Sequence, residues 1–280
     1  MKASYTNCKK GEGNPNHNDR HINLKSAPHI DQKRMHLNSY WHIYQNSDPG
    51  LSFEKAEHVF YREIFKDYRK ACNKKARETR HGERVKTVES MLRNPRTCPE
   101  ETIIQIGNVY EQPDPNDPKY RADLLDIMKK MQQYSNEITN GHCRILNVAL
   151  HMDESTPHIH YRKVWVYNDD GMTQLGAEKA LQHAGVPLPN PEIPVSSSNS
   201  RKMTYDRLMR DRLYSLCREK GLEIDEEPDM THTVHLSKKD YIASQTEREQ
   251  QIELIRKARE KTKKVRYHGQ EGREETPGNP

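Results

Sequence analysis

Apolar residues recur at helical spacing in three segments of the chain. The first is 53–80, where Ser52 can cap the N-terminus and the apolar positions of the first half lie on one face. The second is 120–135. The third is 201–220, which Gly221 closes. We therefore expect three amphipathic helices, the first of which becomes strongly basic toward its end.

Strand-like runs alternate with these helices. Residues 3–8, 102–106, 144–150 and 158–167 are rich in apolar and β-branched side chains and are bounded by turn residues. The last two runs are separated only by a short polar segment, which predicts adjacent strands of one sheet. Segments 11–16, 112–119 and 187–199 are rich in Pro, Gly, Asn or Ser and predict loops.

Composition sets the domain organisation. Only 32% of the residues are hydrophobic and 31% are charged, so we expect one packed domain with solvated pieces outside it. We place the packed domain at 1–236, a charged helical extension at 237–268 and a disordered tail at 269–280. The domain boundaries follow the loss of apolar residues toward the C-terminus.

The charge distribution suggests a polyanionic partner. The net charge is only +5, but Lys and Arg are concentrated in 69–86 and again in 256–266. Solvated helix faces would explain the same stretches equally well. No apolar segment of signal-peptide or membrane-spanning length is present, so we expect a cytoplasmic location. The five cysteines have no Cys-x-x-Cys spacing, which indicates neither a disulfide framework nor a cysteine zinc site.

The segment His151–His160, HMDESTPHIH, concentrates candidate metal ligands. Because alternate residues of a strand share a face, His158 and His160 point the same way, and the return of the chain can bring His151 beside them. Three imidazoles leave open positions on a divalent ion, as a catalytic metal requires. Glu154 is a fourth ligand or an acceptor that orients a ring, and Asp153 is a second candidate for the orienting role.

A surface histidine pair would usually have no function, and a His-x-His sequence alone is weak evidence. Three histidines and two acids within ten residues that join two strands are stronger. The helical His-Glu-x-x-His site of metalloproteases is excluded by both spacing and strand context. The sequence therefore predicts a metal centre at this turn.

Three motifs resemble one known family. The segment H-x-D-E-S-T-P-H-x-H is similar to the metal motif of Mob/Pre-type plasmid mobilisation relaxases, which belong to the HUH endonuclease group. Upstream, His17-Asn18-Asp19-Arg20 resembles that family's H-N-[ED]-R motif, and 36–38, His-Leu-Asn, follows in the expected order. The resemblance covers roughly residues 1–225.

This resemblance implies an α+β fold, with an antiparallel β-sheet flanked by helices and a charged helical C-terminal extension. It implies site- and strand-specific nicking and rejoining of origin-of-transfer DNA, single-stranded or in a hairpin, through a covalent 5′-phosphoryl-histidine intermediate. His17 would be the nucleophile, with Arg20 and Glu154 beside it as catalytic residues, and His151, His158 and His160 would hold the metal. Mn²⁺ or Mg²⁺ is the first expectation, and Zn²⁺, Co²⁺ and Ni²⁺ are alternatives. A coupling protein or a homodimer is a further expected contact.

Several alternatives stay open at this stage. Tyr40 is the competing nucleophile, because it closely follows the 36–38 motif. A rolling-circle replication initiator would instead use a tyrosine after the metal motif, at Tyr205 or Tyr214. A non-catalytic plasmid DNA-binding regulator would bind DNA without nicking it, and a histidine-ligated oxygenase would need an apolar pocket that the low hydrophobicity disfavours.

Contacts with DNA phosphates are expected from basic residues of the helices and of the site. We expect Arg20, Arg162, Arg201 and Lys202 to contact DNA, with affinity dominated by phosphate contacts and sensitive to salt. Aromatic residues make up only 7% of the chain, so base stacking is expected to contribute little.

Overall fold

The computed structural model describes residues 1–108 and 111–224 of the chain. The predicted extension 237–268, the tail 269–280, the last part of the predicted domain 1–236 and the basic stretch 256–266 lie outside the described residues. The described residues all belong to one compact unit. Among them, no helix is long and apolar enough to cross a membrane.

An antiparallel sheet forms the centre of the molecule, as expected for the α+β class. Its strands, within the described residues, are β1 (Ala3–Asn7), β2 (Ser39–His42), β3 (Glu100–Ile106), β4 (Cys143–His151), β5 (His158–Asp169) and β6 (Met172–Leu175). The spatial order is β1-β3-β5-β4-β2, and β6 pairs with the distal part of β5. The two strands that carry the metal motif, β4 and β5, are therefore neighbours in the middle of the sheet.

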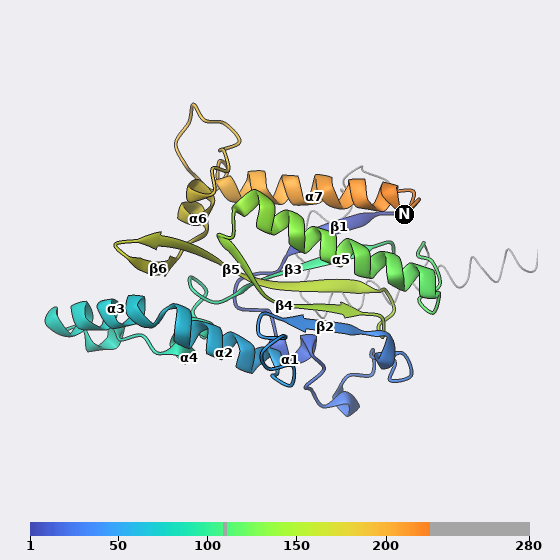
Figure 1. Ribbon diagram of the computed structural model, residues 1–280, viewed down its shortest axis with the longest axis horizontal. Coiled ribbons are helices and arrows are strands. Elements are labelled where there is room, and N and C mark those ends of the chain that lie inside the picture. The colour runs from blue at the N-terminus through green and yellow to red at the C-terminus, as the bar shows by residue number, and fades with distance from the viewer. Residues whose placement is uncertain (109–110, 225–280) are drawn as a thin grey trace, which may run out of the picture. The chain divides into compact units, whose positions relative to one another are not determined.

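Helices cover both faces of this sheet (Figure 1). They are α1 (Pro15–Asn18), α2 (Phe53–Ile64), α3 (Lys66–Glu78), α4 (Val88–Arg93), α5 (Pro118–Thr139), α6 (Ala177–His183) and α7 (Arg201–Glu219), with 3-10 turns η1 (Leu24–Ser26), η2 (Met35–Leu37) and η3 (Gly82–Arg84). The long helices α5 and α7 lie along one face, and α1 to α4 lie along the other (Figure 1). The larger apolar core is formed beneath α5 and α7.

The alternation of β5 divides its side chains between these two faces. Tyr161 faces α5, where its hydroxyl donates to the carbonyl of Met128 at 2.6 Å. His160 faces the α1 side, and farther along the strand Val164 joins a smaller apolar cluster with Phe60 of α2. The histidines therefore point away from the main core and toward the layer of short helices.

The predicted helix 53–80 is two helices, with a break at Phe65. This residue has ψ 19° and leaves the helical conformation. Its fully buried ring packs 5.0 Å from that of Tyr61, centroid to centroid, so burial of an aromatic side chain accompanies the break. The basic part beyond it forms α3, whose only buried residue is Ala76. Tertiary packing here overrides a helical pattern that runs through the sequence without a Pro or Gly.

Short elements were not predicted from the sequence. They include β2, α4, β6 and α6, each of seven residues or fewer. Segments of this length contain too few apolar positions to define a period. The omission of β2 matters most for function, because this strand pairs with β4 and places Tyr40 opposite Ala149, near the metal motif.

Candidate metal centre

The predicted metal motif forms the turn between the two central strands. His151 and His158 are paired residues at the ends of β4 and β5, and His160 lies one step farther along β5 on the same face. The three ring centroids are 4.7 to 5.2 Å apart. The predicted convergence of His151, His158 and His160 is present in the structure.

In each of these rings, one nitrogen donates a hydrogen bond to an acceptor. The other nitrogen of a neutral ring then carries the lone pair that can bind a metal. His151 Nε2 donates to the Asn18 carbonyl at 2.9 Å, and His158 Nδ1 donates to the Thr156 carbonyl at 2.8 Å. His160 Nδ1 donates to Glu101 Oε1 at 2.7 Å, while its Nε2 is buried without a partner. Orienting acceptors behind imidazole ligands are typical of metal sites.

The free nitrogens of His151 and His158 are spaced as two ligands of one divalent ion would be. His151 Nδ1 lies 3.4 Å from His158 Nε2, and two ligands bound tetrahedrally at about 2.1 Å would be roughly that far apart. Among the described residues, two overlapping sets have all ligand atoms within 4.8 Å: His17 with His151 and His160, and His151 with Glu154 and His158. The donor set of imidazoles and a carboxylate fits Mn²⁺, Co²⁺ or Zn²⁺.

The electrostatic environment keeps the ligands in the state that a metal needs. Burial, together with the neighbouring histidines, lowers the pKa of His158 to about 4 and moves the pKa of His151 in the same direction. Both rings are therefore neutral near pH 7. Burial works to raise the pKa of Glu154, but bonds and charges from His17, His158 and Arg20 hold it below its ordinary value, so its carboxylate is ionised.

Arg20 joins the upstream motif to the metal turn. Its Nε donates to Asp153 Oδ2 at 2.9 Å, and its Nη2 donates to Asp153 Oδ1 and to Glu154 Oε1. Its backbone has φ 62°, a left-handed conformation that is uncommon outside glycine. Arg20 is only 7% exposed. In this position the guanidinium of Arg20 holds the carboxylates of Asp153 and Glu154.

His17 lies on α1, facing the metal turn. Asn14 caps this short helix, accepting from the backbone of His17 at 3.3 Å. His17 Nε2 lies 3.3 Å from Arg20 Nη1 and 3.5 Å from Glu154 Oε1, and its ring centroid is 5.5 Å from that of His151. Its side chain is 27% exposed, against 10% or less for His151 and His158. His17 is thus the accessible histidine of this cluster.

Asn38 of the 36–38 motif is part of the site, whereas His36 is not. Asn38 Nδ2 donates to Asp153 Oδ2 at 2.7 Å, and its Oδ1 accepts from the Met152 amide. Asn38 Nδ2 also donates to the Tyr40 hydroxyl at 3.0 Å. His36 instead bonds to the Lys33 carbonyl at the surface.

Tyr40 lies beside the centre but is not joined to it by a hydrogen bond from a histidine. Its ring centroid is 6.5 Å from that of His151. Burial raises the pKa of its hydroxyl, which makes the phenolate less available near neutral pH. Tyr205, one of the two tyrosines that a rolling-circle initiator would use, belongs to α7 on the opposite face of the sheet and is 1% exposed.

Several contacts at the turn were not predicted from the sequence. Arg34 Nη2 donates to the Glu154 carbonyl at 3.0 Å, and the Asp31 amide donates to the Asp153 carbonyl. Gln112 Nε2 donates to the Ser155 carbonyl at 2.7 Å from the other side. These bonds join main-chain groups to residues far away in the sequence, so no local motif could have revealed them.

The basic residues predicted to contact DNA are mostly engaged in ion pairs. Arg162 is 4% exposed and is bound by Glu57 and Glu101, so it has no free surface for a phosphate. Arg201 pairs with Glu178. Lys202 pairs with Asp206 and Glu100, at the N-terminal end of α7. The expectation for Arg162 is corrected on this ground, because a guanidinium saturated by two buried carboxylates cannot also bind DNA.

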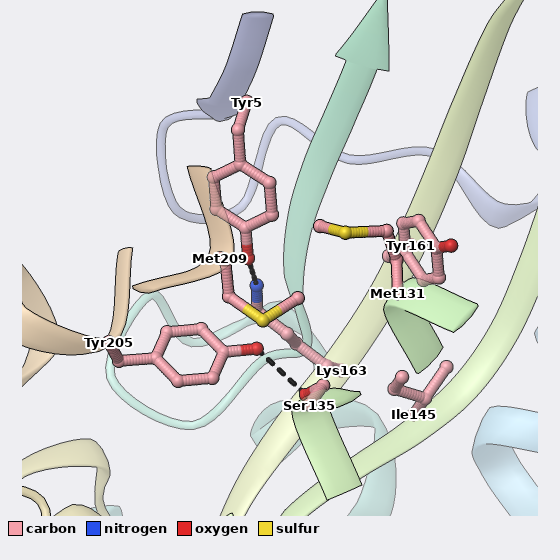
Figure 2. A pocket seen from close by; sticks show the side chains of 8 residues that line it. All are labelled: Tyr5, Met131, Ser135, Ile145, Tyr161, Lys163, Tyr205 and Met209. Carbon is pink, nitrogen blue, oxygen red and sulfur yellow. Dashed lines mark hydrogen bonds between the residues drawn. The ribbon is translucent and has the colours of Figure 1, made fainter. Parts of the chain in front are cut away.

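The neighbouring charge on β5 also lies in the interior, on the other face. Figure 2 shows Lys163 enclosed by Tyr5 and Tyr205, with its ammonium group donating to the Tyr5 hydroxyl at 2.9 Å. Thr102 Oγ1 accepts a second bond at 2.7 Å. The charged pair after His160 in the sequence is therefore two separate buried cations, not a basic surface.

Fold and site together define a histidine-rich centre at the end of a central antiparallel β-hairpin, with an accessible histidine opposite it. No protein-family model matches the sequence, and no curated protein matches it. Similar solved structures are those of the relaxase domain of MobM (MOBV; Mob_Pre), bound to plasmid pMV158 oriT DNA and to Mn.

In one of these, with 22-nucleotide DNA, the identity is 17%, the TM-score is 0.48, and the match covers 87% of this chain and 100% of that chain. In another, with 22-nucleotide DNA carrying a 3′-thiophosphate, the identity is 17%, the TM-score is 0.49, and the coverage is 87% and 99%. The family named for these structures is the one that the three sequence motifs resemble.

Proposed function

We propose that this chain is a relaxase: a metal-dependent enzyme that nicks one strand of origin-of-transfer DNA and later rejoins it. The observation that carries the proposal is the joining of the two motifs in space. Arg20 binds Asp153 and Glu154, and His17 faces the metal turn across Glu154. Residues far apart in the sequence thus meet at one place, which supports a single site with His17 as the nucleophile and the histidines of the turn as metal ligands.

His151, His158 and His160 would hold the divalent metal, with Glu154 as a further carboxylate within reach. When bound, the ion would act as a Lewis acid that offsets charge on the scissile phosphate. Burial keeps the rings of His151 and His158 neutral, and the acceptors behind them orient these rings. A water-poor floor beneath the phosphate would strengthen these electrostatic effects.

His17 would attack phosphorus, forming a phosphorus–nitrogen bond while the bond to the 3′ oxygen breaks. The departing oxygen takes a proton from solvent water and becomes a 3′-hydroxyl, and the 5′-phosphoryl group stays on His17. His17 Nε2 lies between a donor, Arg20 Nη1, and an acceptor, Glu154 Oε1, so the ring has a partner with or without a proton there. Its exposure allows the strand to reach it, unlike the buried ligands.

A direct test assays nicking of supercoiled origin DNA with Mn²⁺ by His17→Ala and Tyr40→Phe. We expect His17→Ala to lose roughly 10³-fold or more in rate, as removal of a nucleophile does. We expect Tyr40→Phe to keep most of its activity and to form the covalent DNA complex. If His17→Ala nicks normally while Tyr40→Phe does not, the nucleophile is Tyr40. If neither the wild-type chain nor any variant nicks with any divalent metal, the protein is a DNA-binding regulator.

The remaining partners are part of the same proposal. DNA would approach along the α1–α4 side, where α3 carries the basic stretch that begins at Arg69 and has almost no buried residues. A coupling protein and a homodimer are also proposed as partners. The choice of Mn²⁺ over other divalent ions follows from the donor set only in part, since imidazole and carboxylate also suit Co²⁺ and Zn²⁺.

A further inference from the structure

A chain of buried, ionised side chains lies directly behind His160. Arg162 donates through Nε and Nη2 to both carboxylate oxygens of Glu57, and through Nη1 to Glu101 Oε2 at 3.0 Å. The other oxygen of Glu101 accepts from His160 Nδ1. Glu57, Glu101, His160 and Arg162 are each at most 6% exposed.

This arrangement fixes the direction of the hydrogen bond between Glu101 and His160. Because Arg162 already donates to Oε2, the carboxylate must accept on both sides, and His160 Nδ1 must carry the hydrogen. The lone pair is then on Nε2, the buried atom that has no protein partner and faces the other histidines. The ion pair therefore selects the ring nitrogen that His160 presents.

The same ion pair also supports the loop that carries His17. A Cβ atom built on Gly13 would overlap both Arg162 Nη1 and Glu101 Oε2. Gly13 directly precedes Asn14, the N-cap of α1, on which His17 lies. Only a residue without a side chain allows the backbone to approach the ion pair this closely.

We propose that Glu57, Arg162, Glu101 and Gly13 form a positioning unit that aligns the two halves of the site. Glu101 sets the tautomer and orientation of His160, Glu57 holds Arg162 in place, and the packing of Gly13 on the ion pair sets the distance of His17 from the ligands. The inference rests on the proposed function for its consequence in catalysis. The claims about the His160 tautomer and the packing of Gly13 concern the protein without metal or DNA.

The tautomer of His160 is the first test, and it needs no variant. Nitrogen-15 NMR of the ring in the metal-free wild-type protein, assigned by comparison with His160→Gln, should show a protonated Nδ1 and an unprotonated Nε2. A ring protonated at Nε2 would overturn the proposal. This readout does not depend on metal or on activity, so it also holds if the proposed function fails.

The variant Glu101→Gln tests the consequence for metal binding. Arg162 would hold the amide oxygen, which turns the amide NH₂ toward His160 Nδ1 and shifts the ring hydrogen to Nε2. We expect the affinity for Mn²⁺, measured by calorimetry, to fall 10- to 100-fold, as on loss of other orienting acceptors. In this variant, nitrogen-15 NMR should show the His160 ring protonated at Nε2 and unprotonated at Nδ1.

A matched control exists on the same strand. Glu100 is the adjacent residue, is similarly buried and is also paired with cations, but it faces Lys163 and Lys202 on the other side of the sheet. Glu100→Gln should therefore lose comparable stability while binding Mn²⁺ as the wild-type chain does. Equal Mn²⁺ affinity in both variants would overturn the proposal. Absence of Mn²⁺ binding by the wild-type chain would overturn the proposed function instead.

Gly13→Ala tests the link to His17. Its methyl group would push the loop away from the ion pair, so we expect the rate of single-turnover nicking to fall 10-fold or more with the DNA affinity unchanged. Gly50→Ala is the control, because a Cβ there meets only Asp48 Oδ1, at an ordinary contact distance of 3.9 Å. A normal rate in Gly13→Ala, with the loop displaced in its crystal structure, would show that the packing at Gly13 does not position His17.

Discussion

Each face of strand β5 has a buried cation, but the two cations have different surroundings. Arg162 and Lys163 are adjacent in the sequence and are 4% and 2% exposed, but they point to opposite sides of the sheet. Arg162 is bound by two carboxylates, one of which orients a candidate metal ligand. Lys163 is held by the hydroxyls of Tyr5 and Thr102 and by one carboxylate, within the main core.

The polar groups around the two cations differ accordingly. On the histidine face, the free nitrogen of His160, both side-chain atoms of Asn18 and both ring nitrogens of His42 are buried without a partner. The ammonium group of Lys163 is fully engaged, and its charge also lies over the rings of Tyr5 and Tyr205, 5.3 Å from each centroid. Buried polar groups left unpaired are costly, and they tend to occur where function requires them. On the α5–α7 side, Thr204 Oγ1 is also buried without a partner, so the histidine face is set apart by having an unpaired nitrogen on a candidate metal ligand.

Metal removal should have the largest effect, and on the histidine face only. With a chelator present, we expect nicking to fall at least roughly 10³-fold, since the Lewis acid supplies several kcal/mol to the reaction. Added Mn²⁺ should restore the rate, and far-ultraviolet circular dichroism should not change. A rate that the chelator leaves intact would show that the histidine centre is not used in the reaction.

Exchange of each buried cation for methionine compares the faces directly. Arg162→Met leaves two buried carboxylates facing each other, so we expect it to lower the free energy of unfolding by about 3–5 kcal/mol and to weaken Mn²⁺ binding. Lys163→Met should cost less, because Lys202 still pairs with Glu100, and should leave Mn²⁺ binding unchanged. Urea unfolding and calorimetry measure both quantities. A change in Mn²⁺ affinity caused by Lys163→Met would break the division between the faces.

The central part of the site was predictable because it is local in sequence. His151, His158 and His160 fall on one face of a hairpin whose strands have clear apolar runs, so their convergence follows from strand geometry. The fold class followed from the family resemblance. The roles of Asp153 as a partner of Arg20 and of Glu101 as a partner of His160 were not predictable, since each contact joins residues far apart in the sequence.

Other errors have a single physical origin. Burial cannot be read from charge alone: Arg162 looks like a DNA contact in the sequence and lies in the interior because Glu57 and Glu101 pair with it. The break at Phe65 likewise depends on where an aromatic ring finds space. Both depend on tertiary contacts that local sequence patterns do not contain.

Acid should destabilise the metal-free protein through the histidine face. The pKa of His158 is about 4 in the folded protein and near 6.5 when unfolded, so the unfolded chain takes up the proton first. Its contribution is fully present above pH 6.5 and is lost progressively as the pH falls toward 4. We expect about 2 kcal/mol less stability at pH 5 than at pH 7.5 from this group. His158→Gln should remove that part of the pH dependence, measured by urea unfolding in a chelator, and an unchanged slope would contradict it.

The smallest effect is expected on the opposite face, at Tyr205. This residue is on the buried side of α7, on the far side of the sheet from the histidines, and its hydroxyl shares a hydrogen bond of 2.8 Å with Ser135 Oγ. Tyr205→Phe removes this bond and should lower the free energy of unfolding by about 1 kcal/mol. Nicking and the covalent DNA complex should be unaffected, because a side chain that is 1% exposed cannot reach a phosphate at the histidine centre. If Tyr205→Phe instead lost the covalent complex while its stability stayed nearly intact, the nucleophile would be Tyr205. The reaction would then take place on the α5–α7 face and not on the histidine face.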